Sequence, residues 1–276
     1  MSTTSRIVAV VCLLVTCVVA GCGGGGVGGG GVAGGPGRAA KARVRVVERY
    51  FEQGLDGCTP GDSGCAWVRF SHPFVEKAAT RDAADSMNAW IRATVFEPAE
   101  AGDSVVTNAE LWSARFFARN AEFRREFPDA PSAWYERRAI VLHGDTLGLA
   151  CFKYTRERYG GGAHPNTEVF YHCFDARSGR SMTLDSLVRP GMRAVLDSIG
   201  ERAFRQARAI PEGQKLKDAM FTFEGGRFEL TDNIGFGAAG MTVEFNPYEV
   251  APYVSGPTSF TLPWSEVRPL LDLPPK

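Results

Sequence analysis

The stretch Leu147–Asp175 decides the fold of this chain. It reads LGLACFKYTR, then ERYGGGAHPN, then TEVFYHCFD. The two outer parts are rich in aromatic and β-branched residues, whereas the middle part is rich in glycine and also contains a proline and an asparagine. Two such runs on either side of a turn-rich loop are typical of a β-hairpin. We therefore expect two antiparallel strands joined by a loop over residues 157–166.

The two cysteines of this hairpin predict its register. If Cys151 lies opposite Cys173, three further pairs of residues across the hairpin match in shape or charge. Aromatic and opposite-charge pairs across two strands contribute about 0.2–1 kcal/mol each, and a shift by one residue would turn the buried face outward. The pairs that follow from this register are Tyr154–Phe170, Arg156–Glu168 and Ala150–Phe174.

The rest of the chain is expected to contain helices and further short strands. Apolar residues at helical spacing predict helices over 80–96, 107–127, 190–209 and 263–271. Thr80 or Asp82 is expected to cap the first helix, and Thr107 the second. The fold class is therefore α+β, an antiparallel β-sheet (a meander with the central hairpin) packed against a few helices. Strands are expected over 66–75, 134–143, 147–156, 167–175, 221–230, 242–245 and 259–262, and 41–56 is either a strand or a short helix.

The composition and the first residues indicate an exported protein. The chain has 31 basic and 31 acidic residues, and this balance gives no support for a nucleic-acid partner, which needs a basic face. Arg6 precedes the apolar run 7–20, which is the layout of a secretory signal over residues 1–21. The run is shorter than the roughly 20 apolar residues that cross a membrane.

The end of the signal, Val19-Ala20-Gly21-Cys22, resembles the lipobox of bacterial lipoproteins. The resemblance implies cleavage before Cys22, lipidation (palmitate) of that cysteine, and a lipid-anchored, extracytoplasmic place in the cell envelope. In a two-membrane bacterium it implies the outer membrane, facing the periplasm. Residues 22–40 are dominated by glycine and form a flexible tether. The alternative is an ordinary secretory signal with a chance cysteine.

Four cysteines remain after the signal and the lipid site: Cys58, Cys65, Cys151 and Cys173. An even number of cysteines in an exported protein indicates disulfides, and four allow three connectivities. We favour Cys58–Cys65 across a short turn and Cys151–Cys173 across the hairpin, with free buried thiols as the alternative. No pair has the Cys-x-x-Cys spacing of a zinc site, and no metal is expected.

The sequence contains none of the motifs that define common catalytic sites. It has no Gly-x-Ser-x-Gly elbow, no His-Glu-x-x-His motif and no phosphate-binding loop. Its four histidines are far apart and show no metal-ligand spacing. We therefore predict that the protein is not an enzyme, and expect no catalytic residues and no cofactor.

Three strings of residues resemble one known family. They are the loop 159–166, the string Phe174-Asp175 with Gly179, Leu184, Asp185 and Leu187, and the string Asn246-Pro247-Tyr248-Glu249-Val250-Ala251-Pro252-Tyr253. Together they resemble the RsiV/PdaC-type extracytoplasmic domain of unknown function, which we expect over residues 132–276. The segment from His72-Pro73-Phe74 to Met87-Asn88 and Ile91 resembles the small partner domain that precedes it in that family, and we expect this α+β domain over residues 41–131.

The resemblance implies an α+β fold and a binding role. In RsiV the domain binds lysozyme, and in PdaC it accompanies a deacetylase without containing the active site. We expect a membrane-anchored binding module for a lysozyme-like protein or a cell-wall glycan (peptidoglycan), without anti-sigma or deacetylase activity. Two alternative functions remain. One is a peptidoglycan hydrolase that uses Glu249 and an aspartate, and the other is a purely structural lipoprotein of envelope assembly.

Two of the three strings contain the candidate binding residues. Glycines let a backbone approach a partner closely or adopt a positive φ, and tyrosines add contact area at low entropic cost. The alternative is structural: the glycines only form the turn, Asn246 caps a turn, the tyrosines fill the core edge, and Glu249 makes a local hydrogen bond. The candidates are Tyr159, His164 and Asn166 in the hairpin loop, and Asn246, Tyr248, Glu249 and Tyr253 in the second string.

Overall fold

The computed structural model of the chain describes residues 44–99, 102–130 and 133–274. The expected signal (1–21), the expected lipidation site Cys22 and the expected tether (22–40) lie outside the described residues. No helix within these three ranges combines the length and the apolar character that are needed to cross a membrane.

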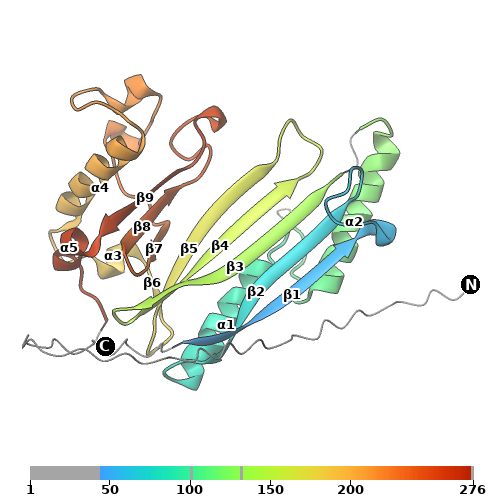
Figure 1. Cartoon of the computed structure of the whole chain (residues 1–276), viewed down its shortest axis with the longest axis horizontal. Coiled ribbons are helices and arrows are strands. Elements are labelled where there is room, and N and C mark those ends of the chain that lie inside the picture. The colour runs from blue at the N-terminus through green and yellow to red at the C-terminus, as the bar shows by residue number, and fades with distance from the viewer. Residues whose placement is uncertain (1–43, 100–101, 131–132, 275–276) are drawn as a thin grey trace, which may run out of the picture. The chain divides into compact units, whose positions relative to one another are not determined.

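A six-stranded sheet forms the larger β-layer (Figure 1). Its strands follow one another in sequence order. Residues 41–56, which were expected to form either a strand or a short helix, contain strand β1. The strands are β1 (Arg45–Gly54), β2 (Trp67–Lys77), β3 (Tyr135–Thr146), β4 (Leu149–Tyr159), β5 (Asn166–Asp175) and β6 (Ser181–Met182).

The α+β class and the meander β3–β4–β5 are confirmed, and the sheet as a whole is mixed. Strands β2 and β3 pair in parallel, whereas the other neighbouring strands of this sheet are antiparallel. A parallel pair needs a long crossover, and two helices between β2 and β3 supply it. The pairing places residues from both sides of position 131 in one sheet, and the division into domains 41–131 and 132–276 stays a prediction.

The central hairpin has the register that its cysteines predict. Cys151 lies opposite Cys173, and Tyr154 lies opposite Phe170 with ring centroids 6.1 Å apart.

The turn that joins β3 to β4 contains Gly148 with φ of 84°, a conformation that glycine adopts without strain. A Cβ atom at Gly148 would lie 2.7 Å from the backbone oxygen of Pro274. Only glycine therefore fits this turn.

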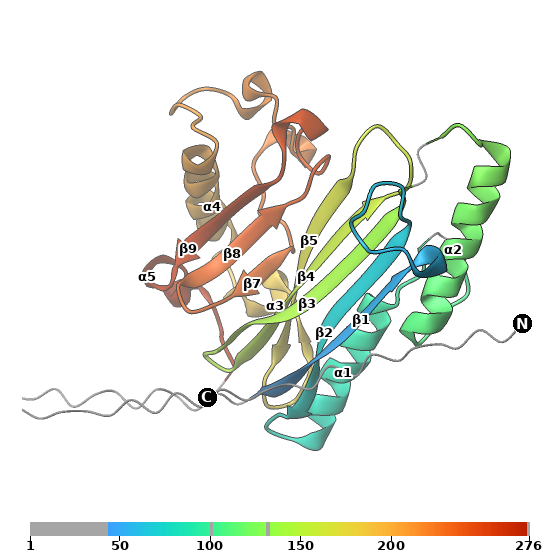
Figure 2. The same ribbon diagram turned by 45° about the vertical axis from the view of Figure 1, so that its right-hand side comes forward.

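Helices α1 (Arg81–Val95) and α2 (Ala109–Glu126) cover one face of the large sheet (Figures 1 and 2). Fully burying one large apolar side chain contributes about 1.5–3 kcal/mol, so this shared core is the main reason the layers stay together. The core includes Met87 and Ile91 of α1, Trp112 and Phe116 of α2, and Val68, Phe70, Ile140 and Phe152 of the strands.

The caps of these helices follow their sequences with one difference. Thr80 caps α1, since its side chain accepts a hydrogen bond from the amide of Ala83 at 3.1 Å. Helix α2 is capped by Asn108 and not by Thr107, because the Asn108 side chain accepts from the amide of Leu111 at 2.8 Å. Asparagine is as good an N-cap as serine or aspartate and a better one than threonine, so the helix begins one residue later than expected.

A buried charged cluster lies between the large sheet and α2. Glu136 Oε1 accepts hydrogen bonds from Nε of Arg138 at 2.6 Å and from Nε of Arg156 at 2.9 Å. The guanidinium of Arg138 is fully buried and lies 4.5 Å from the centre of the Trp112 ring. Its Nη1 also donates to the backbone oxygen of Glu97 at 2.8 Å. Because Glu97 follows α1 and Trp112 belongs to α2, the cluster fastens both helices to the sheet.

A three-stranded antiparallel sheet forms the second β-layer, and a phenylalanine-rich core lies between it and helix α4. Phe204 of α4 is fully buried, with its ring centroid 5.0 Å from that of Phe221 and 5.6 Å from that of Phe245. The strands are β7 (Ile234–Phe236), β8 (Gly240–Phe245) and β9 (Thr258–Pro263). The helices are α3 (Leu184–Leu187), α4 (Arg193–Ala207) and α5 (Trp264–Val267). Short 3₁₀ turns are Leu55–Gly57, Leu216–Ala219, Glu224–Gly226, Tyr253–Ser255 and Arg268–Leu270.

Residues 221–230 correct one expectation. They were expected to form short strands, but they contain the 3₁₀ turn and no strand. Their alternation of buried and exposed side chains has another cause, since Phe221, Phe223 and Phe228 all pack on Phe204. Strand β7 was not predicted, and α4 begins at Arg193, three residues after the expected start.

Both expected disulfides are present, Cys58–Cys65 and Cys151–Cys173. Cys151 and Cys173 are buried, and their Cα atoms lie 4.0 Å apart across the hairpin. The sulfur of Cys173 lies 3.8 Å from the backbone oxygen of Ile234 in β7. This disulfide therefore closes the hairpin at the place where the second sheet packs on it.

Removing the hairpin disulfide with Cys151→Ala and Cys173→Ala is expected to lower the free energy of unfolding by about 3 kcal/mol, because the unfolded chain regains the entropy of an open 22-residue loop. The shorter Cys58–Cys65 loop serves as the matched control, with an expected loss of about 2 kcal/mol. Urea unfolding of both double variants measures the difference. A larger loss for the Cys58–Cys65 pair would contradict the prediction.

Candidate binding site

The two candidate segments meet in the folded chain. The ring of His164, in the loop between β4 and β5, stacks on the ring of Tyr253, in the segment between β8 and β9, with centroids 3.7 Å apart and an interplanar angle of 16°. The hydroxyl of Tyr253 donates to the backbone oxygen of Pro165 at 2.8 Å. Loop 160–165 and segment 246–256 therefore form one surface, which we name the two-loop tip.

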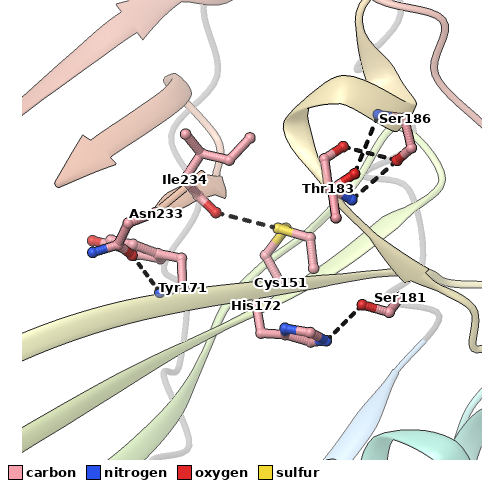
Figure 3. The surroundings of a disulfide bond; sticks show 9 residues. Cys151, Tyr171, His172, Ser181, Thr183, Ser186, Asn233 and Ile234 are labelled. Atoms are coloured by element: carbon pink, nitrogen blue, oxygen red, sulfur yellow. Dashed lines mark hydrogen bonds between the residues drawn. A yellow bond between two sulfur atoms is a disulfide. The ribbon is translucent and has the colours of Figure 1, made fainter. Parts of the chain in front are cut away.

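Asn246 fastens the second segment to strand β5. Its Nδ2 donates to the backbone oxygen of Val169 at 2.9 Å, and its Oδ1 accepts from the Val169 amide at 2.7 Å. Asn233 Nδ2 donates to the same Val169 oxygen at 2.7 Å, and Asn233 Oδ1 accepts from the Tyr171 amide at 2.8 Å (Figure 3). A side-chain amide has the donor and acceptor of a peptide group. The two asparagines thus cover the stretch of the β5 edge that β6 leaves open.

Tyr248 is presented to solvent by a strained backbone. Its φ is 69° and 64% of the residue is exposed. A left-handed conformation costs a non-glycine residue about 1–2 kcal/mol and persists only where neighbours enforce it. Asn246 and Glu249 enforce this conformation through two hydrogen bonds that span Tyr248. Glu249 Oε2 accepts from the backbone amide of Asn246 at 2.8 Å, and the backbone amide of Glu249 donates to the backbone oxygen of Asn246 at 3.2 Å.

Apolar surface gathers around this strained residue. The ring centroid of Tyr248 lies 5.5 Å from that of Tyr253, and Val254, the next residue along the chain, is 86% exposed. Because Tyr253 is itself held by His164 and Pro165, these apolar groups are displayed on a rigid support. Such pre-ordered aromatic surface is what protein interfaces use as anchors.

Tyr159 and Asn166 lie outside this arrangement. The Tyr159 ring has its nearest aromatic neighbour in Tyr135, at 6.2 Å between centroids. Burial, with a hydrogen bond to Glu157, raises the pKa of Tyr135 to about 12. Asn166 begins β5 opposite Arg158, and its buried Oδ1 has no hydrogen-bond partner among the described residues. The structure therefore joins His164 of the hairpin loop, but not the other two candidates, to the second segment.

A group of polar residues between the two sheets was missed by the sequence analysis. Glu244 of β8 is buried, and burial raises the pKa of its carboxyl although Ser259 and Lys153 act in the opposite direction. Burial also raises the pKa of Tyr171 to about 12, with a contribution from Glu244. The pKa of His143 is lowered by burial and by Lys153. These residues come from five strands, and no local spacing connects them.

Glu244→Gln is expected to raise the free energy of unfolding at neutral pH and to leave it unchanged at low pH. The carboxyl has a higher pKa in the folded protein than its ordinary 4.5. Stability is therefore lost as the pH rises from 4.5 through the raised pKa, and glutamine, which does not titrate, avoids that loss. Urea unfolding of both proteins between pH 4 and pH 8 tests this. Parallel pH profiles for the two proteins would contradict it.

The structure defines a disulfide-bonded α+β domain in which two loops form one candidate binding surface. Residues 185–265 match the model of the family described as "Protein of unknown function (DUF3298)". The disulfides are consistent with a place outside the cytoplasm.

Two solved structures have the same fold. A DUF3298 family member from Bacteroides fragilis is 16% identical, with a TM-score of 0.65 over 84% of this chain and 96% of that chain. A DUF3298 family protein from Pseudomonas aeruginosa is 14% identical, with a TM-score of 0.62 over 83% of this chain and 94% of that chain. At these identities the likeness shows the fold alone. No curated protein matches the sequence.

Proposed function

We propose that this protein is a lipid-anchored binding module of the cell envelope, and that its two-loop tip binds a lysozyme-like protein. Cys22 carries the lipid and residues 22–40 form the tether in this proposal. The protein acts by binding and not by catalysis. The observation that carries the proposal is the strained, exposed Tyr248, since strain of this kind persists where function uses it.

The chemistry of the tip favours a protein partner over a glycan. The ring of His164 already stacks on Tyr253, so a face of each ring is covered and is not open to a sugar. The exposed groups are instead the Tyr248 side chain and the aliphatic Val254. Tyrosine is among the residues that contribute most to protein interfaces when they become buried. The tip is therefore suited to fill a pocket on a partner protein.

Calorimetry of the full chain in detergent micelles tests the proposal, with a lysozyme and separately with peptidoglycan fragments as the probes. Lysozyme binding that is lost in His164→Ala and Tyr248→Ala would support it. Tyr50→Ala is the matched control, because Tyr50 is 65% exposed but belongs to β1. Binding of glycan alone would move the function to the cell wall, and binding of neither probe would refute the proposal.

A further inference from the structure

An open cavity of about 1250 Å³ lies between α4 and residues 215–229. None of its lining residues belongs to the two-loop tip, and the proposed function does not use it. Its walls are the polar side of α4, with Ser198 and Glu201, and the chain around Gly225 and Gly226. The cavity lies within the part of the chain that matches the family model.

One wall of the cavity consists of the 3₁₀ turn Glu224–Gly226 and the irregular segment 227–229 that follows it. Phe223 and Arg227 are extended, with φ and ψ of −113° and 149°, and −123° and 147°. Phe223 and Phe228 are buried, whereas Glu224 and Arg227 are exposed. In the described part of the chain, no strand pairs with this segment. The buried phenylalanines thus form an apolar floor beneath a segment that belongs to no sheet.

The backbone of this wall has unused hydrogen-bonding groups. Among the described residues, the amides of Arg227, Phe228 and Glu229 donate to no backbone or side-chain acceptor. Segment 227–229 is fixed to α4 at its C-terminal end, because the amide of Leu230 donates to Asp197 Oδ1 at 3.1 Å. A row of unpaired peptide groups on an ordered segment is a template on which another chain can add a strand.

The charges around the cavity favour an acidic ligand. Lys215, Lys217 and Arg227 line it, and none of them forms an ion pair with another described residue. Glu224 is the lining carboxylate that is likewise unpaired within this part of the structure. The unpaired lining charges are therefore mostly positive. The other lining carboxylates are paired with arginine, Asp197 and Glu229 with Arg193 and Glu201 with Arg205.

We propose that this cavity is a second binding site, which takes an extended acidic peptide segment of a partner protein. The peptide lies extended along residues 227–229, and its carbonyl oxygens accept hydrogen bonds from the amides of Arg227 and Glu229, which an extended backbone directs to the same side. Alternate side chains of the peptide rest on the phenylalanine floor, and its carboxylates face Lys215, Lys217 and Arg227. Backbone pairing supplies affinity and the charges supply the preference for acidic sequences.

Fluorescence anisotropy of the full chain in detergent micelles tests the backbone part of the proposal. The probe is a fluorescein-labelled, blocked octapeptide of alternating valine and glutamate. Saturable binding that weakens with added salt is expected. The same peptide with N-methyl groups on alternate residues keeps its charges, but the methyl groups prevent the close backbone approach that strand pairing needs, and its affinity is expected to fall at least about 10-fold. Absence of binding, or equal binding of the N-methylated peptide, would overturn the proposal.

The charge part is tested with variants whose fold is checked by circular dichroism. Lys217→Glu combined with Arg227→Glu is expected to weaken peptide binding at least about 10-fold. Arg81→Glu is the matched control and should leave binding unchanged, because Arg81 is a highly exposed cation on α1. Tyr248→Gly should also leave it unchanged, which separates this site from the two-loop tip. Equal loss in Arg81→Glu would show a nonspecific charge effect and overturn the proposal.

Discussion

Replacing Glu136 by alanine is expected to lower the free energy of unfolding by about 3–5 kcal/mol, the largest effect of any single substitution considered for this chain. Glu136 accepts hydrogen bonds from both Arg138 and Arg156. The exposed fractions of the three side chains are 4%, 0% and 13%. Without the carboxylate, the guanidinium groups of Arg138 and Arg156 stay buried but lose the negative charge and the hydrogen-bond acceptor that they share. Urea unfolding followed by circular dichroism measures the loss.

Two further variants separate this buried charge effect from ordinary loss of an ion pair. Asp85→Ala breaks the Arg81–Asp85 pair, whose side chains are 92% and 68% exposed, and should change stability by less than about 0.5 kcal/mol. Glu136→Leu combined with Arg138→Met removes much of the buried charge together and should recover part of the loss. A Glu136→Ala loss as small as that of Asp85→Ala would show that the guanidiniums become solvated.

Tyr248→Gly is expected to weaken binding of a lysozyme-type partner at least about 30-fold, which corresponds to a hot-spot contribution of about 2 kcal/mol. The same change should leave stability unchanged or raise it by up to about 1 kcal/mol, because glycine adopts the positive φ of this position without strain. A variant that binds more weakly but is no less stable shows that the Tyr248 side chain serves recognition and not folding. Calorimetry and urea unfolding of one preparation measure both.

Tyr248→Ala provides the matched comparison for the backbone effect. Alanine also removes the ring, so binding should fall as it does in the glycine variant, but alanine keeps the strained φ. The glycine variant should therefore be more stable than the alanine variant by about 1 kcal/mol. An alanine variant that is more stable than the glycine variant would contradict the account of strain at Tyr248.

The central hairpin and its disulfide could be predicted from the sequence because they depend on local pattern. Side chains alternate across a strand with a period of two, so a short loop and one pair of cysteines leave a single register. Cys151 and Cys173 are separated by only 22 positions. The caps and lengths of α1 and α2 were predicted nearly as well, since a helix end is decided by the few residues around it.

The remaining parts of the fold depend on contacts between distant residues. The parallel pairing of β2 with β3 spans two helices, and no periodicity within either strand distinguishes it from an antiparallel pair. Glu136, Arg138 and Arg156 alternate with other residues of their strands like an exposed charged face. They are buried because the helices cover that face.

The sequence by itself determined which loops contain the candidate binding residues, because unusual strings of glycine, proline and tyrosine stand out locally. Only the tertiary structure decided how they act together. Tyr253 and Pro165 are 88 positions apart, and Asn246 and Val169 are 77 apart, so their contacts arise when the second sheet packs beside β5. The strain at Tyr248 likewise follows from the hydrogen bonds of Asn246 and Glu249, because a φ of 69° is imposed by surrounding structure and not by the preference of a tyrosine.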